Sequence, residues 1–419
     1  MYKPKNIIVC LDGTGNQIEE NISNVLKLYR ALNRDGNAKQ KQVSFYDQGI
    51  GTIGQQNTWG VISQKAKSIW GLATGYGLDQ NVLRAYRFLA ENYHQEITKD
   101  KNKKDIVLRD KIFLFGYSRG AHTVRVLAGF IYNMGLLKPE QLHLAGAALT
   151  AYKRASTRKG MEEIIHFNKI TQPIELSIEF IGVWDTVSSM ITPRRDRFLI
   201  PALERLKNTD VNPSVKAFRH AMSIDESRRM FRVDAWSEPQ EFKPNFHSIK
   251  KIADQDISQV WFPGFHGDVG GGNKRTESGM SQFSLCWMIK ESMKFGLLFN
   301  TRMVDYVALG VPYTKNTNYN YPLPDHKAKL HGSKKSGWAI LEVIPKLSKF
   351  REKRRLQSRF SFKWIYFPIW ESRYIPDKSY VHEAAISRIN AIANYNPKNI
   401  PKTYSVIKHD KRRSKFWAK

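Results

Sequence analysis

Four short apolar runs occur before residue 264, each five or six residues long and each followed by a turn that contains Gly or Asp. Three of these turns lead into stretches with the apolar spacing of a helix. Strands that alternate with helices are typical of a parallel sheet covered by helices on both faces. The strands that this pattern predicts are residues 6–11, 111–115, 178–183 and 259–263.

Two helices are predicted on either side of the second strand. Residues 78–93 carry apolar side chains three or four positions apart, and residues 121–132 show helical character after the strand. Ligands of parallel sheets bind beyond the carboxyl ends of the strands, so the segments that follow the strands are the expected place for chemistry. These segments are residues 12–16, 116–120, 184–186 and 264–272.

The segment after the second strand reads Gly-Tyr-Ser-Arg-Gly over residues 116–120 and leads directly into a helix. A serine between a strand and a helix, flanked by glycines, has the pattern of a nucleophile elbow. The glycines remove Cβ atoms that would clash where strand and helix approach each other. The pattern therefore predicts that Ser118 is a nucleophile. The alternative is a small-residue turn with a buried structural serine.

A serine nucleophile needs a histidine base and a carboxylate that orients it, in the chain order Ser, Asp, His for this kind of elbow. Asp185 and His266 follow the third and fourth predicted strands and would share a sheet edge with Ser118. Asp185 could instead cap a helix or turn, and His266 could be structural. The rival carboxylate is Asp268, and the rival base is His382.

The backbone N–H of Arg119 is the expected first donor to the oxyanion of the reaction, with Gly13 and Thr14 placed to supply the second. Asp12, which precedes them, opens an alternative. An aspartyl phosphatase of the Asp-x-Asp-Gly-Thr kind would use an aspartate two positions earlier, but that residue is Cys10. We therefore do not favour Asp12 as a nucleophile.

Composition adds one strong feature, a formal charge of +29 that arises from 67 Lys and Arg against 38 Asp and Glu. Such a charge favours polyanionic partners, either an anionic membrane surface or nucleic acid. The basic residues are dense at 346–363, just before the aromatic run 364–370, and again at 408–419. These segments are candidates for contact with a membrane surface.

Cys10 and Cys286 lie in apolar runs, which indicates buried thiols and no disulfide framework. The apolar run near the N-terminus is too short for a signal peptide, and no run approaches the roughly 18 apolar residues of a membrane span. We therefore expect a protein that is made in the cytoplasm without a signal peptide. The residues suggest no metal or cofactor.

Six segments together resemble the catalytic domain of the type VI secretion phospholipase effectors, an α/β hydrolase. The resemblance implies that Ser118, Asp185 and His266 are the nucleophile, acid and base. The chain departs from the family at Gly15, where a bulky residue is usual, and at Gly267, where a small hydroxylated one is usual. Neither change removes a catalytic atom. The matching segments are residues 11–14, 46–52, 115–121, 182–187, 223–228 and 261–272.

The predicted fold class is α/β, an α/β-hydrolase-like, mainly parallel sheet with helices on both faces, insertions, and a basic, aromatic-rich C-terminal region. Residues 1–295 would form the catalytic domain, and residues 296–419 a basic region packed on the core and facing the membrane.

The predicted function is a serine hydrolase that cleaves ester bonds of glycerophospholipids through an acyl-enzyme on Ser118. The resemblance implies an effector that a type VI system delivers into target cells, with a secretion-machinery or immunity protein as partner. Nucleic acid is not favoured as a partner. The alternatives are a soluble carboxylesterase and a non-catalytic polyanion- or membrane-binding protein on a hydrolase scaffold.

Overall fold

The computed structural model describes residues 2–13, 21–35, 40–49, 77–99, 105–187, 191–193, 201–203, 206–228, 231–243, 253–313, 320–332, 346–347, 365–366 and 369–409. Thr14, Gly15, most of the basic segment 346–363 and residues 364, 367 and 368 of the aromatic run lie outside the described residues, as do residues 410–419. The expectations for these segments remain predictions.

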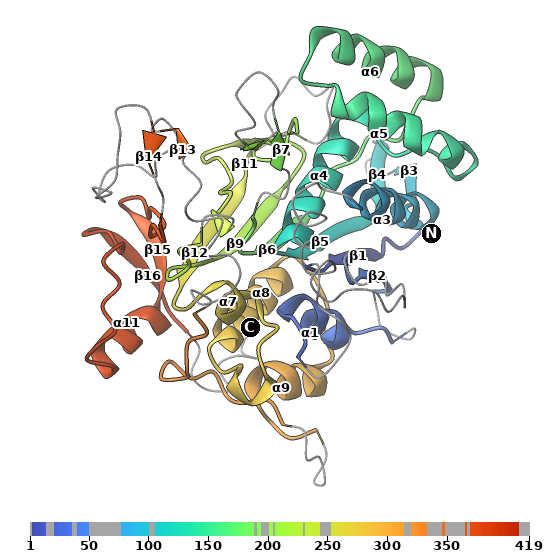
Figure 1. Ribbon diagram of the computed structural model, residues 1–419. Helices are drawn as coiled ribbons and strands as arrows, with labels where there is room; N and C mark the ends of the chain where they lie inside the picture. Colours follow the sequence, from blue (N-terminus) through green and yellow to red (C-terminus); the bar gives the residue numbers. More distant parts are fainter. Residues whose placement is uncertain are drawn as a thin grey trace, which may run out of the picture.

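Eight strands of the described chain form one sheet, and every neighbouring pair in it is parallel (Figure 1). The order across the sheet is β16-β15-β12-β9-β6-β5-β1-β2. The fold is therefore α/β and hydrolase-like, as the sequence predicts. The strands are β1 (Asn6–Leu11), β2 (Gln42–Asp47), β5 (Lys111–Tyr117), β6 (Phe180–Trp184), β9 (Ala217–Ser223), β12 (Asp256–Phe262), β15 (Ser379–His382) and β16 (Tyr404–Ile407).

The four predicted strands are β1, β5, β6 and β12, and the bounds of β1 agree with the prediction. The apolar pattern did not predict β2, β9, β15 and β16. Strand β9 is buried along its whole length but contains Arg219 and His220, so it has no continuous apolar run. Both of these side chains have partners: Arg219 bonds Glu291 at 2.7 Å, and His220 accepts a hydrogen bond from the Thr186 N–H at 3.0 Å.

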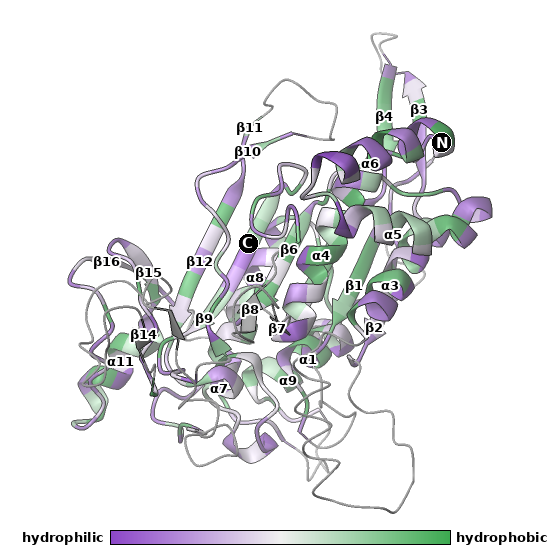
Figure 2. Cartoon of the chain, turned by 45° about the horizontal axis from the view of Figure 1, so that its top comes forward, coloured by the Kyte–Doolittle hydropathy of each residue, from purple (hydrophilic) through white to green (hydrophobic). Residues whose placement is uncertain are grey.

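Helices cover both faces of the sheet (Figure 1). The side chains of β1 alternate between two cores: Ile7 and Val9 pack with α3 and α4, while Ile8 and Cys10 pack with α1 and α8. Figure 2 shows the same layering, with an apolar β1 inside and a largely hydrophilic α6 outside. On one face lie α3 (Leu78–Asn92), α4 (Arg119–Met134), α5 (Ala145–Lys153) and α6 (Arg158–Thr171); on the other lie α1 (Asn24–Ala31), α7 (His266–Gly270), α8 (Ser281–Lys294) and α9 (Thr301–Leu309).

The remaining elements are short. The described chain contains four small antiparallel pairs, two 3₁₀ helices and one further helix beside the β15 edge. None of the described helices combines the length and the apolar character needed to cross a membrane. These elements are β3 (Gln95–Lys99) with β4 (Asp105–Arg109), β7 (Ile191–Pro193) with β8 (Pro201–Leu203), β10 (Glu241–Phe242) with β11 (Ala253–Asp254), β13 (Lys346–Leu347) with β14 (Ile365–Tyr366), η1 (Pro139–Leu144), η4 (Arg275–Glu277) and α11 (Glu383–Ala391).

The sheet continues past residue 295, where the sequence analysis divided the chain. Strands β15 and β16 pair in parallel beside β12, and Val381 and Ile375 share a small core with Trp261. The region after residue 295 therefore supplies two strands, β15 and β16, to the same eight-stranded sheet as the region before it. Cys10 and Cys286 are buried free thiols, as predicted.

The start of α4 packs directly on the end of β1. A Cβ built on Gly120 would lie 2.1 Å from the Leu11 carbonyl oxygen and 2.5 Å from that of Asp12, and both of these are backbone atoms. Only glycine allows the helix to approach the strand this closely. The contact fixes the position of the elbow relative to β1.

We expect Gly120→Ala to lower the free energy of unfolding by about 1–3 kcal/mol, because the strand backbone must shift to admit the methyl group. Gly146→Ala is the matched control in the exposed part of α5, where an added Cβ meets nothing within 4 Å. It should be neutral or stabilise by roughly 0.5–1 kcal/mol. Urea denaturation of both variants measures the difference, and equal stabilities would contradict the proposed packing constraint.

Candidate active site

Three side chains from three strand ends form one hydrogen-bonded chain. Ser118 follows β5, Asp185 follows β6, and His266 begins α7 after β12. The distance from His266 Nε2 to Ser118 Oγ is 2.8 Å, and His266 Nδ1 lies 2.5 Å from Asp185 Oδ2. This is the arrangement of nucleophile, base and orienting carboxylate. The structure thus brings together the three residues that the sequence analysis selected.

Ser118 has the backbone conformation expected of an elbow. Its φ is 58° and its ψ is −121°, values that a non-glycine residue rarely adopts. Its N–H donates to the Trp184 carbonyl oxygen at 3.0 Å, which ties the turn to the end of β6. A Cβ on Gly116 would lie 2.6 Å from the Ala121 Cα. The flanking glycines therefore permit the tight turn, as the sequence indicated.

Asp185 is fully buried and strongly constrained. Its φ is 41°, and its carboxylate accepts the Ser223 N–H at 2.9 Å. Arg373 donates hydrogen bonds to both carboxylate oxygens, from Nη1 to Oδ1 at 2.5 Å and from Nη2 to Oδ2 at 3.0 Å. Burial alone would raise the pKa of Asp185, but the Arg373 guanidinium and the His266 hydrogen bond outweigh it and hold this pKa well below its usual range. The carboxylate is therefore ionised.

Sequence reasoning missed Arg373. The residue is 188 positions from Asp185 and lies just before β15, in a segment with no motif of its own. Nothing in the local pattern separates it from the many other basic residues of the chain. Only the folded structure shows that Arg373 contacts Asp185.

His266 is held in a largely closed environment, with 6% of its surface exposed. The Tyr117 ring lies against the imidazole at 4.8 Å, and the Phe231 ring meets it edge-on at the same distance. Its backbone N–H donates to Glu226 at 3.3 Å. Burial lowers the pKa of His266, and Asp185 offsets only part of that effect. The imidazole is therefore neutral near pH 7, as a base requires.

The turn that carries His266 is held in place by α1, which lies on the same face of the sheet. The side-chain amide of Asn24 on α1 donates to the carbonyl oxygens of Val269 and Ser281 at 3.0 and 2.9 Å. A Cβ on Gly270 would lie 1.9 Å from the Tyr117 ring, so α7 packs directly on the elbow tyrosine. These contacts set the distance between the base and the nucleophile.

Asp268, the rival carboxylate, binds backbone and side-chain groups outside the Ser118–His266–Asp185 chain. Its carboxylate accepts the backbone N–H groups of Phe265 and His331 at 3.0 Å each, and it bonds the His331 ring at 2.7 Å and the Asn273 amide at 2.9 Å. It caps the start of α7 and ties in the segment around residue 331. The His266 ring donates its Nδ1–H to Asp185 instead.

His382, the rival base, lies at the end of β15 and caps α11. Its Nδ1 accepts the Ala384 N–H at 3.2 Å, and its ring stacks on Phe262 at 4.5 Å. Burial holds its pKa well below the usual value. This is a satisfied core histidine, and Ser118 bonds His266.

Of the two predicted oxyanion donors that the structure describes, Arg119 lies where it was expected and Gly13 bonds another group. Arg119 is the first residue of α4, so its backbone N–H is at the helix start next to Ser118, and its role stays a prediction. The Gly13 N–H donates to the Asp12 carboxylate at 2.7 Å, contrary to the expectation that it would face the substrate. Asp12 also accepts the Ser23 and Tyr46 hydroxyls and thereby organises the turn after β1. Thr14 lies outside the described residues.

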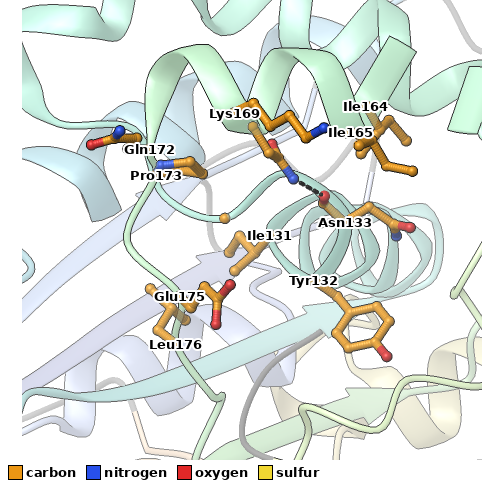
Figure 3. A pocket seen from close by; sticks show the side chains of 12 residues that line it. Ile131, Tyr132, Asn133, Ile164, Ile165, Lys169, Gln172, Pro173, Glu175 and Leu176 are labelled. Carbon is orange, nitrogen blue, oxygen red and sulfur yellow. Dashed lines mark hydrogen bonds between the residues drawn. The ribbon is translucent and has the colours of Figure 1, made fainter. Parts of the chain in front are cut away.

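A pocket of about 240 Å³ opens at the other end of α4, between its last turn and α6 (Figure 3). Ile131, Ile164 and Leu176 give it an apolar wall, with Lys169 and Glu175 beside them. Because α4 rises about 1.5 Å per residue over its length, this pocket is roughly 20 Å from Ser118. It is not part of the candidate active site.

Three kinds of known protein resemble this chain: a curated relative, two solved structures and a family model. An uncharacterized protein of Saccharomyces cerevisiae, YEL023C, is 28% identical over 258 residues, which is 58% of this chain and 34% of the yeast protein. The chain thus spans about a third of that relative. A crystal structure of an uncharacterized protein from Pseudomonas aeruginosa aligns with a TM-score of 0.41 at 18% identity, covering 71% of this chain and 47% of the other.

A second solved structure, the Tle1 effector bound to the VgrG spike of a type 6 secretion system, aligns with a TM-score of 0.32 at 19% identity, covering 64% of this chain and 51% of the effector. The family model described as the catalytic domain of Tle1-like phospholipase effectors of the type VI secretion system matches residues 5–291. The chain therefore belongs to the Tle1-like family of type VI secretion phospholipase effectors.

Proposed function

We propose that this protein is a serine hydrolase that cleaves ester bonds of glycerophospholipids. The observation that carries the proposal is the hydrogen-bonded chain from Ser118 through His266 to Asp185, which follow strands β5, β12 and β6 of one sheet. The match of residues 5–291 to a phospholipase catalytic domain supports a lipid ester as the substrate. A protein that acted only by binding polyanions would not need this arrangement.

The reaction proceeds in two acyl transfers. Ser118 Oγ attacks the ester carbonyl carbon while its proton moves to His266 Nε2, and the oxyanion faces the start of α4 at Arg119. The tetrahedral intermediate collapses to an acyl-serine, and His266 returns the proton to the departing alcohol oxygen. Water then attacks the acyl-serine with His266 again as base. The bond between the acyl carbon and Ser118 Oγ breaks, His266 returns the proton to Oγ, and the fatty acid is released. Asp185 stays ionised and stabilises each imidazolium.

The partners follow from the family and the charge. The formal charge of +29 supports an anionic membrane surface as the place where the substrate is met. The family description supports delivery by a type VI secretion system, with a component of that machinery as a protein partner. An immunity protein that blocks the active site is a further proposed partner.

Ser118→Ala should abolish hydrolysis of mixed-lipid vesicles while the protein remains folded, because only the nucleophilic oxygen is removed. The expected loss of turnover is on the order of a million-fold. Product analysis by mass spectrometry measures it and identifies the ester that is cut. Residual turnover above about a tenth of wild type would contradict the serine mechanism. A wild-type protein that hydrolyses short-chain esters but no vesicle lipid would instead be a soluble carboxylesterase.

His266→Ala should be inactive and His382→Ala active, since the first removes the base and the second a helix cap. For the wild type, the acidic limb of kcat/KM should lie below about pH 6.5, because burial lowers the pKa of His266 and a base works in its neutral form. Initial rates from pH 4 to 8 measure both effects. An active His266→Ala variant would require a different base.

Vesicle binding should increase with anionic lipid, by about 1 kcal/mol for each Lys or Arg that reaches the surface, and about 0.5 M salt should release the protein. Replacing the five Lys and Arg of residues 411–419 by Gln should weaken binding without changing hydrolysis of a soluble short-chain ester. The substitutions should begin after His409, because its ring packs on those of Phe283 and His382. Co-sedimentation measures binding; equal binding to neutral and anionic vesicles contradicts the role of charge.

A further inference from the structure

The carboxylate of the candidate triad is held from the C-terminal part of the chain. Arg373 donates to both oxygens of Asp185, and its side chain is 1% exposed. Asp185 Oδ2 thus receives two donors, Arg373 Nη2 at 3.0 Å and His266 Nδ1 at 2.5 Å. Oδ1 receives Arg373 Nη1 and the Ser223 N–H. The carboxylate plane is therefore fixed by a planar guanidinium that contacts both oxygens.

Arg373 is itself held at several points. Its Nη1 donates to the carbonyl and hydroxyl oxygens of Ser223 at 3.0 and 2.8 Å, and its Nη2 donates to the Phe231 carbonyl oxygen. The Asn399 amide donates to the Arg373 carbonyl oxygen at 3.2 Å and to that of Ile224 at 2.9 Å. The guanidinium thus has little freedom to leave Asp185.

The segment that presents Arg373 is anchored to the strand ends around the site. Glu371 pairs with Arg232 at 3.1 Å. Tyr395 donates to Asp225 at 2.7 Å, and the same carboxylate oxygen accepts the Gly264 N–H at 2.6 Å, two residues before His266. The segment lies beyond residues 5–291, the part that matches the family model.

We propose that Arg373 is a positioning residue of this active site: it acts through Asp185, so that residues 369–399 complete a triad whose three members lie in the family's catalytic domain. The proposal rests on the proposed function. Removing the guanidinium frees a buried carboxylate to turn and to bind water. It also leaves the full carboxylate charge facing His266, because the cation no longer offsets it.

Loss of Arg373 should raise the pKa of His266. The charged groups that act on its imidazole are Asp185 and Glu226, which favour the imidazolium, and Arg228, which opposes it. Without Arg373, the unshielded Asp185 favours the imidazolium more strongly, so His266 should protonate at a higher pH. The acidic limb of the activity profile should therefore move to higher pH as turnover falls. A merely structural arginine would lower activity without this shift.

The test compares Arg373→Gln and Arg373→Lys with Arg388→Gln. Arg388 is a buried arginine of the same segment that donates to the carbonyl oxygens of His326 and Ala328 and does not touch the triad. The readouts are lipid hydrolysis and the rate of labelling by a fluorophosphonate, in which Ser118 Oγ bonds to phosphorus, fluoride leaves and His266 takes the proton. Both are measured from pH 4 to 9, with circular dichroism to monitor folding.

We expect Arg373→Gln to lower both rates by more than about 10-fold but by less than the roughly 10⁴-fold expected when the orienting carboxylate is lost, and to move the acidic limb upward. Arg373→Lys should recover part of the rate, because it keeps the charge but not the two-pronged contact. Arg388→Gln should keep the wild-type pH profile. Equal rates and equal profiles for the Arg373 and Arg388 variants would overturn the proposal.

A double variant keeps the test decisive if Arg373→Gln alone does not fold. Combining Asp185→Asn with Arg373→Gln removes both buried charges together. If Arg373 acts through Asp185, the double variant should be as active as Asp185→Asn alone, within about twofold. A further large loss would show that Arg373 acts by another route and would overturn the proposal. Labelling of Ser118→Ala would instead contradict the proposed function, whatever Arg373 does.

Discussion

The buried charge of Asp185 is the constraint on which the rest of the site depends. A carboxylate with 0% exposure is stable only if every oxygen has donors and its charge has a partner. Those donors come from Ser223 at the end of β9, His266 at the start of α7 and Arg373 before β15. One charge thus links four regions of the chain, and the orientation of the His266 imidazole is one result of that linkage.

The parallel sheet supplies the geometry for this linkage. In a parallel sheet all carboxyl ends meet at one edge, so residues far apart in sequence are brought together without long loops. The strand order changes direction between β1 and β5, and Ser118, at the end of β5, lies beside that point. Close packing then sets the distances: Gly120 lets α4 approach β1, and Gly270 lets α7 approach the Tyr117 ring. The 2.8 Å contact between His266 and Ser118 depends on both approaches.

The rival residues show how burial decides between equivalent side chains. Asp268 and His382 have the same chemistry as Asp185 and His266, yet each is used to begin a helix, α7 and α11 respectively. Gly13 likewise directs its N–H to the adjacent Asp12 carboxylate. In each case a polar group in the interior has taken the nearest partner that satisfies it. Of these histidines and aspartates, only His266 and Asp185 form the hydrogen-bonded chain that reaches Ser118.

The sequence by itself determined the parts of this protein that rest on local patterns. The continuous apolar runs predicted β1, β5, β6 and β12, and the glycine-flanked Ser118 predicted the elbow, because burial on both faces and a strained turn each restrict the residues allowed. Tertiary structure decided what depends on distant partners. Strand β9 was hidden because Arg219 and His220 are buried in it with partners from elsewhere, and Arg373 could not be foreseen because its contact with Asp185 joins residues 188 positions apart. A buried ion pair leaves no period in the sequence; only the folded chain brings its two charges together.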